Sequence, residues 1–267
     1  MINTYFVIMR SEAIKSFFRV FEKFDLSCII LPMKERTILV VVAHPDDAEF
    51  GCGGTVAKYV FEGATAYYLI CTNGARGSRG SDIKSDKLIK VRKKEQLKAA
   101  KVIGVKEVFF LDHGDGELEA DLHLKEEIVR FIRKIKPDIV FTHDPTWIYE
   151  ISDGLASINH NDHRKTGTAT IDAVYPLARD LTSFPEHIEE GLQPHKVLEM
   201  YLFNFNHPTF YVDVSGFFKT KVQSILKHKS QIDNPKETEI WLSKRLREIG
   251  EKGGYEYAEG FTRLVLR

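Results

Sequence analysis

Residues 38–49 read ILVVVAHPDDAE, an apolar run that ends in a cluster of polar side chains. A continuous β-branched run bounded by proline is typical of a central strand in a parallel sheet. Ligands of open α/β sheets bind where such strands end, so we expect His44 and Asp47 to face a crevice. Imidazole and carboxylate groups bind zinc, and a catalytic zinc usually has three protein ligands and a water. The stretch therefore predicts a metal site that lacks one ligand.

A second polar cluster, His160-Asn161-Asp162-His163, is the obvious source of the missing ligand. Each cluster alone has a simpler interpretation. In the first cluster, the proline and aspartate are typical of a turn followed by a helix cap. The second cluster lies near an expected helix start, where polar side chains also act as caps. Two such clusters in one chain nevertheless favour convergence on a metal ion.

Strand-like and helix-like patterns alternate along the chain, which predicts βαβ units with right-handed crossovers. We therefore expect a single α/β domain, Rossmann-like, with a mostly parallel sheet and helices on both faces. The expected strands are 37–43, 66–71, 107–111 and 138–142, and the expected helices are 54–62, 86–103 and 122–135. A helix from 163 to about 177, strands near 197–204 and 209–214, and a helical C-terminal portion should follow.

Composition excludes several classes of protein. Lys+Arg and Asp+Glu are equal at 38 each, so there is no net positive field of the kind that nucleic-acid binding needs. Cys28, Cys52 and Cys71 lack Cys-x-x-Cys spacing and predict neither a disulfide framework nor a thiolate zinc site. A reducing, cytoplasmic location is the default expectation.

Residues 1–34 form an expected N-terminal helical extension to a domain that spans 35–267. No stretch approaches the ~20 apolar residues that span a bilayer, so we expect no integral membrane segment. An apolar stripe at helical spacing instead indicates packing on the domain or on a neighbouring subunit, with attachment to a membrane surface as the alternative. This stripe consists of Ile14, Phe17, Phe18, Phe21 and Phe24.

The two polar clusters resemble the signatures of the PIG-L/LmbE-like family of zinc-dependent N-acetylglucosamine deacetylases. Ala43-His44-Pro45-Asp46-Asp47 matches the first signature and His160-Asn161-Asp162-His163 the second. Within the family, the chain is most similar to the archaeal diacetylchitobiose deacetylases. Weaker matches over roughly residues 36–180 keep the same order: Gly53-Gly54-Thr55, Thr72-Asn73-Gly74, Arg92 with Glu95, and Asp115-Gly116-Glu117-Leu118.

This resemblance implies that His44, Asp47 and His163 bind Zn²⁺, that Asp46 is the general base and that His160 assists at the oxyanion. The chemistry agrees, because in metal-assisted amide hydrolysis the metal polarises the carbonyl and a neighbouring base takes a proton from water. His160 lies three residues before His163, so both rings should lie on one side of a helical turn. If protonated, His160 would stabilise the oxyanion.

Substrate contacts are expected from three further residues. The resemblance implies that Arg92 and Asp115 lie near the sugar. Trp147, in the segment before His160, offers an aromatic platform for a sugar ring, although an aromatic side chain in a loop more often packs locally. Many members carry a glutamate after the second strand where this chain has Ala75, so that function is absent here.

These observations predict an enzyme that hydrolyses the N-acetyl group of a small GlcNAc-containing saccharide, diacetylchitobiose first, and that forms a homo-oligomer. Alternatives are deacetylation of GlcNAc-inositol or GlcNAc-malate, or a non-catalytic glycan-binding module on the same scaffold. A dinucleotide site at Gly51-Cys52-Gly53-Gly54 is a weaker interpretation, because Asp46 and Asp47 would lie where a pyrophosphate needs donors.

Overall fold

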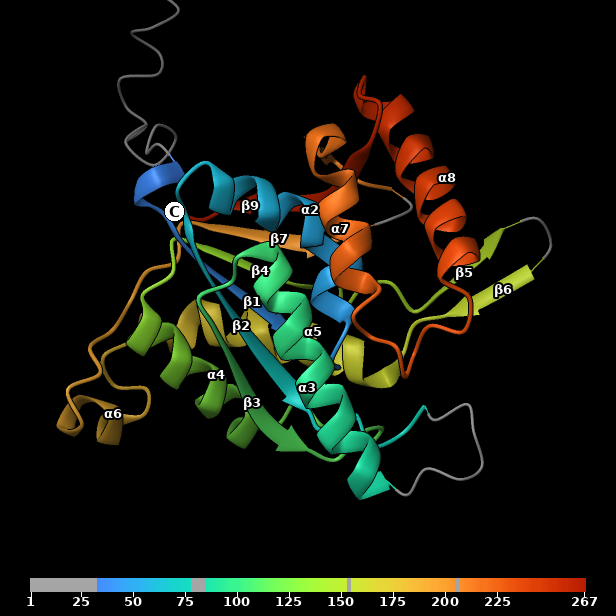
Figure 1. The fold of residues 1–267 in the computed structure, drawn as a ribbon. Coiled ribbons are helices and arrows are strands. Elements are labelled where there is room, and N and C mark those ends of the chain that lie inside the picture. Colours follow the sequence, from blue (N-terminus) through green and yellow to red (C-terminus); the bar gives the residue numbers. More distant parts are fainter. Residues whose placement is uncertain (1–32, 78–84, 153–154, 205–206) are drawn as a thin grey trace, which may run out of the picture. The chain divides into compact units, whose positions relative to one another are not determined.

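A seven-stranded sheet with the order β3-β2-β1-β4-β7-β9-β8 organises the protein (Figure 1). This computed structural model describes residues 33–77, 85–152, 155–204 and 207–267, so the expected extension over 1–34 lies almost wholly outside the described residues. The strands are β1 (Thr37–Val42), β2 (Thr65–Thr72), β3 (Glu107–His113), β4 (Ile139–His143), β7 (Glu199–Phe203), β8 (Phe210–Asp213) and β9 (Ala258–Val265), with a separate hairpin of β5 (Tyr149–Ser152) and β6 (Leu155–Ile158).

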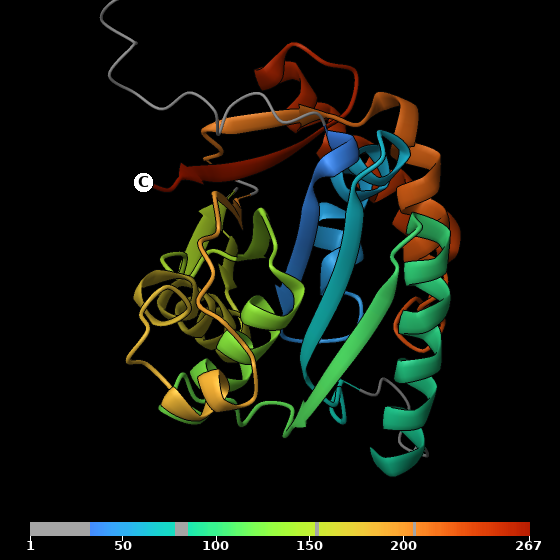
Figure 2. The same ribbon diagram turned by 90° about the vertical axis from the view of Figure 1, so that its left-hand side faces the viewer.

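Helices cover both faces of this sheet, as expected. Ile38 and Val40 of β1 pack into one core and Leu39 and Val41 into the other, because successive side chains of a strand point to opposite faces. Figure 2 shows α3 on one side of the first strands and α4 on the other. The helices are α2 (Asp47–Phe61), α3 (Ser85–Ile103), α4 (Leu122–Ile135), α5 (Asn161–Asp172), α6 (Pro185–Glu189), α7 (Phe218–Ile225) and α8 (Pro235–Gly253), with short helices η2 (Met33–Glu35), η3 (Ala173–Leu177) and η4 (Ser215–Phe217).

The chain changes direction across the sheet between β1 and β4. It runs from β1 to β2 and then β3, and α4 brings it back to β4 on the other side of β1. All of these strands are parallel, so their carboxyl ends lie at one edge of the sheet. A crevice forms at such a switch point, and His44 after β1 and His143 at the end of β4 both lie there.

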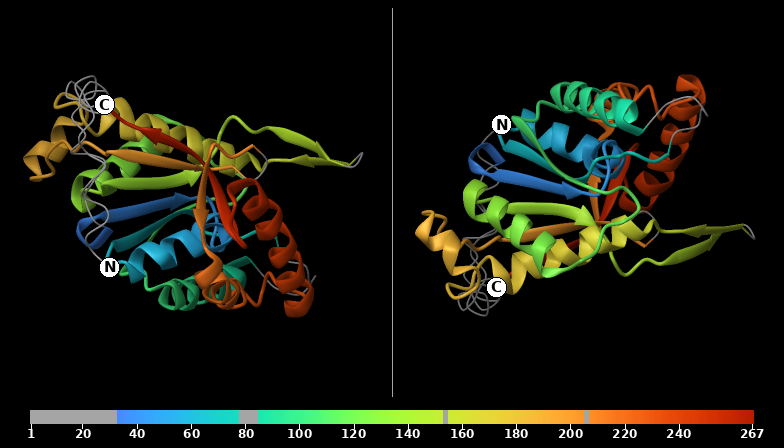
Figure 3. Two further views of the ribbon diagram at one scale, coloured as in Figure 1. Left: turned by 90° about the horizontal axis from the view of Figure 1, so that it is seen from above. Right: turned by 90° about the horizontal axis from the view of Figure 1, so that it is seen from below.

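Three predictions about the elements were wrong. Helix α2 begins at Asp47 and not at residue 54, so its glycines lie inside the helix, where a Cβ at Gly51 would come within 2.7 Å of the Phe203 ring. The segment before His160 contains the β5–β6 hairpin, which extends away from the sheet (Figure 3). The C-terminal portion is not only helical, because β9 pairs antiparallel between β7 and β8.

A buried ion pair between Glu259 of β9 and Lys221 of α7 holds the backbone of α2. The Glu259 carboxylate accepts hydrogen bonds from the backbone N–H groups of Gly54 (2.8 Å) and Thr55 (2.7 Å) and from Lys221 Nζ (2.6 Å). Lys221 also donates to the Phe50 carbonyl (2.7 Å). Backbone donors that a bound pyrophosphate would need are thus already occupied by a protein carboxylate, which removes the basis of the dinucleotide interpretation.

The two described cysteines, Cys52 and Cys71, are buried and free, whereas Cys28 lies outside the described residues. Among the described helices, none combines the length and apolar composition needed to cross a bilayer.

Replacing Lys221 should destabilise the fold strongly. The side chains of Lys221 and Glu259 are only 1% and 2% exposed, so Lys221→Met would leave a buried carboxylate without its cation. Loss of one partner of a buried pair typically lowers the free energy of unfolding by about 3–5 kcal/mol. Urea unfolding at neutral pH measures this. Lys219→Met, an exposed position on the same helix, is the control, and equal stability of the two variants would contradict the prediction.

Candidate active site

Three predicted metal ligands converge at the switch point. His44 follows β1, Asp47 begins α2 and His163 lies in the first turn of α5. His44 Nδ1 is 3.2 Å from His163 Nε2 and 3.4 Å from Asp47 Oδ2, and His163 Nε2 is 3.2 Å from Asp47 Oδ1. Tetrahedral zinc with bonds of ~2.0–2.1 Å places its ligand atoms roughly 3.3–3.4 Å apart. Each pair of side chains therefore has donor atoms at about the spacing of two corners of such a site, with one oxygen of Asp47 near each histidine.

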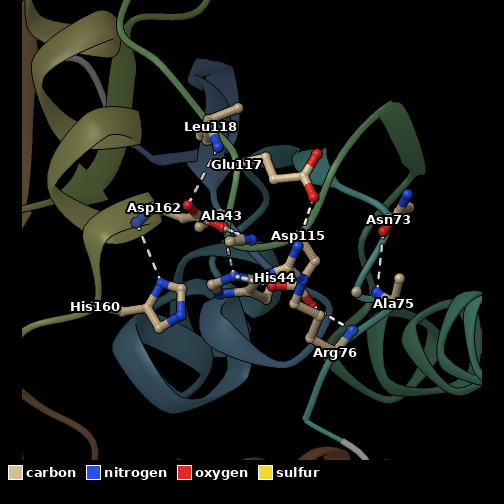
Figure 4. A network of polar contacts seen from close by, with 12 residues as sticks. Ala43, His44, Asn73, Ala75, Arg76, Asp115, Glu117, Leu118, His160 and Asp162 are labelled. Atoms are coloured by element: carbon tan, nitrogen blue, oxygen red, sulfur yellow. Dashed lines mark hydrogen bonds and ion pairs between the residues drawn. The ribbon is translucent and has the colours of Figure 1, made fainter. Parts of the chain in front are cut away.

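The outer ring nitrogens of both histidines are engaged elsewhere. His44 Nε2 lies 3.2 Å from a carboxylate oxygen of Asp115 and 3.2 Å from one of Asp162. Figure 4 shows His44 with these two residues around it. His163 Nδ1 lies 3.2 Å from Asn159 Oδ1. When the outer nitrogens donate these hydrogen bonds, the inner nitrogens present lone pairs to the space between the three side chains. Metal-binding histidines are usually oriented in this way.

Electrostatics of the cluster also favour a cation. Burial alone would lower the pKa of His44, but hydrogen bonds to Asp115, Asp162 and Asp47 outweigh it and raise the pKa to about 12. Burial would raise the pKa of Asp47, yet His163 and His143 hold it well below its usual range. A positive charge is therefore stabilised between these groups, and a metal ion can replace the proton on His44 Nδ1. Two imidazoles and a carboxylate suit zinc and related divalent ions.

Asp46 lies beside the cluster in an unusual backbone conformation. Its φ of 111° is in the left-handed region, which costs of order 1–3 kcal/mol for a residue other than glycine. Gln96 Oε1 accepts the Asp46 backbone N–H at 2.9 Å, and Arg92 donates to the Pro45 carbonyl at 2.8 Å. Burial raises the pKa of the Asp46 carboxyl to about 6, which suits a group that exchanges protons near neutral pH.

His160 differs from the expectation of a protonated ring. Its Nδ1 accepts the backbone N–H of Asp162 at 3.1 Å and caps the start of α5, so the proton of the neutral ring lies on Nε2. Burial, followed by the charges of His44 and His163, lowers its pKa. The charge of Asp162 acts in the opposite direction but does not offset these effects, and its carboxylate hydrogen-bonds to His44 and to the Gly116 N–H.

A cavity of about 450 Å³ opens beside the cluster, within the range of small-molecule sites. Trp147 lines it, as its predicted role requires. Arg92 and Asp115 do not line it; they are 4% and 5% exposed and hold the first motif from behind, so their contact with sugar stays a prediction. Polar side chains at one end are Asp46, Asp47, His143, His160 and His163, and the other walls include Phe50, Trp147, Phe203, Trp241 and Arg245.

Several residues of the site were not predicted from the sequence, among them His143, Gln96 and Trp241. His143 Nε2 lies 3.3 Å from Asp47 Oδ2, its ring stacks on His163 at 4.1 Å, and burial lowers its pKa to about 4. It could have been found, because it ends a buried strand and precedes an Asp-Pro pair, much as His44 does. Gln96 and Trp241 lie inside ordinary helical patterns that carry no such signal.

A candidate three-donor metal site with a carboxylate beside it, at the switch point of a parallel sheet, is typical of metal-dependent hydrolases. Residues 39–174 match the model of the PIG-L family, described as GlcNAc-PI de-N-acetylase. The chain belongs to this family and is an N-deacetylase, a hydrolase of amide bonds.

Known relatives agree with this assignment. The chain is 33% identical over 231 residues to the diacetylchitobiose deacetylase of Thermococcus kodakarensis, which covers 84% of this chain and 82% of that protein. It is 24% identical to a probable N-acetyl-alpha-D-glucosaminyl L-malate deacetylase 2 of Bacillus anthracis, over 86% of this chain and 91% of that protein. The structure of the N,N'-diacetylchitobiose deacetylase from Pyrococcus horikoshii superimposes with a TM-score of 0.81 at 29% identity, covering 95% of this chain and 92% of that one.

Removing one ligand should remove the metal. We expect His163→Ala to fold but to retain little bound metal after dialysis, because only two of the three donors remain. Elemental analysis against protein concentration measures this. His207→Ala, which changes an exposed histidine elsewhere, should keep the full content. Stoichiometric metal in the His163 variant would remove His163 from the ligand set.

Proposed function

We propose that this protein binds zinc through His44, Asp47 and His163 and removes acetate from the N-acetylglucosamine unit of a small saccharide, with diacetylchitobiose as the first candidate. The observation that carries the proposal is the convergence of these three side chains, with donor atoms 3.2–3.4 Å apart, beside Asp46 at the cavity. Similarity to the diacetylchitobiose deacetylase of Thermococcus kodakarensis supports the choice of saccharide.

Asp46 is the proposed general base. Zinc, when bound, supplies positive charge that polarises the acetamido carbonyl and makes water a better nucleophile. The Asp46 carboxylate lines the cavity next to Asp47, where it takes a proton from the attacking water and later delivers it to the leaving amine. Two adjacent carboxylates thus have different roles, since Asp47 is held ionised while the pKa of Asp46 is raised to about 6.

His160 is the proposed donor to the carbonyl oxygen. With Nδ1 occupied by the Asp162 N–H, its Nε2–H is available to donate to an oxygen that gains negative charge. This role needs no proton beyond that of the neutral ring. His160 therefore acts in its neutral form, in agreement with its lowered pKa.

The cavity walls support a sugar substrate. Phe50, Trp147 and Trp241 offer aromatic faces on which the apolar face of a pyranose can pack. Arg245 adds a cationic side chain to the same wall, which favours a second candidate, a GlcNAc conjugate with an anionic aglycone such as malate.

Acetate release from a panel of substrates tests the function. The zinc-loaded protein should release acetate from diacetylchitobiose with a higher kcat/KM than from GlcNAc, GlcNAc-inositol or GlcNAc-malate. Preference for GlcNAc-malate would select the second candidate. Saccharide binding without acetate release from any member of the panel would contradict an enzymatic role and indicate a glycan-binding module.

The Asp46→Asn variant should distinguish the general base from the metal ligands. We expect this variant to keep its zinc and lose at least ~100-fold in kcat, since general-base assistance contributes about that much. Asp47→Asn should instead lose zinc. In the wild type, kcat/KM should rise with pH as Asp46 deprotonates, with a midpoint at or below about 6, because the nearby metal charge favours the ionised form. Zinc loss in Asp46→Asn with retention in Asp47→Asn would reverse the two assignments.

A further inference from the structure

A chain of buried polar side chains lies behind Asp46, away from the metal cluster. Gln96 of α3 accepts the Asp46 backbone N–H with Oε1 at 2.9 Å, and its Nε2 donates to Glu49 Oε1, also at 2.9 Å. The second carboxylate oxygen of Glu49 lies 3.2 Å from Nε2 of His228, just after α7. The side chains of Gln96, Glu49 and His228 are completely buried, and none of them lines the cavity.

The donor and acceptor groups of this chain fix the direction in which each hydrogen bond runs. The two ends of a glutamine side chain have nearly the same shape, so an isolated Gln96 could turn either its oxygen or its nitrogen toward Asp46. An ionised carboxylate only accepts hydrogen bonds. Glu49 therefore keeps the Gln96 nitrogen on its own side and the oxygen facing the Asp46 N–H. His228 occupies the other oxygen of Glu49 and limits its rotation.

The Asp46 backbone needs such a partner. Its left-handed φ is unfavourable for a residue with a side chain and persists only where the surroundings enforce it. Besides Gln96, Arg92 holds the neighbouring Pro45 carbonyl, and its Nη2 lies 3.4 Å from Asp46 Oδ2. Arg92 thus holds the Pro45 carbonyl and the Asp46 carboxylate, and Gln96 holds the Asp46 amide.

We infer that Gln96 and Glu49 are positioning residues that fix the Asp46 backbone through a directed hydrogen-bond relay anchored by His228. The inference rests on the proposed role of Asp46 as the base. The side chains of the relay contact neither the donor atoms of the proposed metal ligands nor the cavity. Loss of the relay should therefore misplace the base without releasing zinc or weakening substrate binding. Small displacements of a reacting group can lower a rate by up to about 100-fold.

Gln96→Met tests the relay, because methionine has nearly the same shape and no amide. We expect kcat to fall ~10- to 100-fold, while KM and zinc content stay near those of the wild type. Lys98→Met, at an exposed position on the same helix, is the matched control. A zinc-loaded Gln96→Met protein with wild-type kcat would show that Asp46 needs no such support.

Exchanging the two side chains gives a sharper test. Gln96→Glu alone puts two carboxylates face to face and should lower kcat. The double variant Glu49→Gln/Gln96→Glu restores a donor between positions 49 and 96, keeps an acceptor for the Asp46 N–H and preserves the total charge. Its kcat should recover most of the loss. No recovery in a folded, zinc-loaded double variant would overturn the directed relay, since simple filling of a buried space predicts no such rescue.

A readout that does not depend on turnover separates this inference from the proposed function. Hydrogen exchange of the Asp46 amide, measured by NMR, should be slow in the wild type and the double variant and faster in Gln96→Met. If the wild type releases no acetate from any substrate but its exchange follows this order, the proposed function fails and the relay stands. Equal exchange in all three proteins would overturn the relay.

Discussion

The site depends on the hydrogen bonds that His44 makes with its outer ring nitrogen. Asp115, after β3, and Asp162, in the first turn of α5, both lie 3.2 Å from His44 Nε2. Asp162 also accepts the Gly116 backbone N–H, so the loop after β3 is tied to the start of α5. Three segments that are distant in sequence thus meet at one imidazole. Its resulting orientation turns Nδ1 toward Asp47, and the ligand geometry follows from that.

Carboxylates outnumber cations around this imidazole. Asp46, Asp47, Asp115 and Asp162 surround His44, whereas Arg92 is the guanidinium that pairs with Asp46 and Asp115. Burial of so many acidic groups is favourable only if positive charge is held among them. A divalent ion would meet this need better than the single extra proton of His44. The cluster already keeps neighbouring carboxylates in different states, because the pKa of Asp46 is raised and that of Asp47 is lowered.

Short-range sequence patterns predict much of the fold, and they also predict the proposed metal ligands. Runs such as residues 38–42 are apolar enough to require burial on both faces, and His44 and His163 lie in polar clusters beside expected strand and helix ends. Strand β9 was missed because its place between β7 and β8 is decided by pairing partners that lie 45 to 66 residues earlier in the sequence. Gln96 was missed for a similar reason, since its partners Glu49 and Asp46 come from another helix and a turn.

The pairing of Glu259 with α2 also bears on how the chain acquires its structure during synthesis. The Glu259 carboxylate accepts a hydrogen bond from the Gly54 N–H. The two residues are separated by 205 positions in the sequence. While the ribosome is still making the intervening chain, the helix that begins with Asp47 lacks this partner and the sheet lacks β9. Contacts of such long range slow folding. The nascent protein therefore completes the support of helix α2 only after residue 259 has emerged.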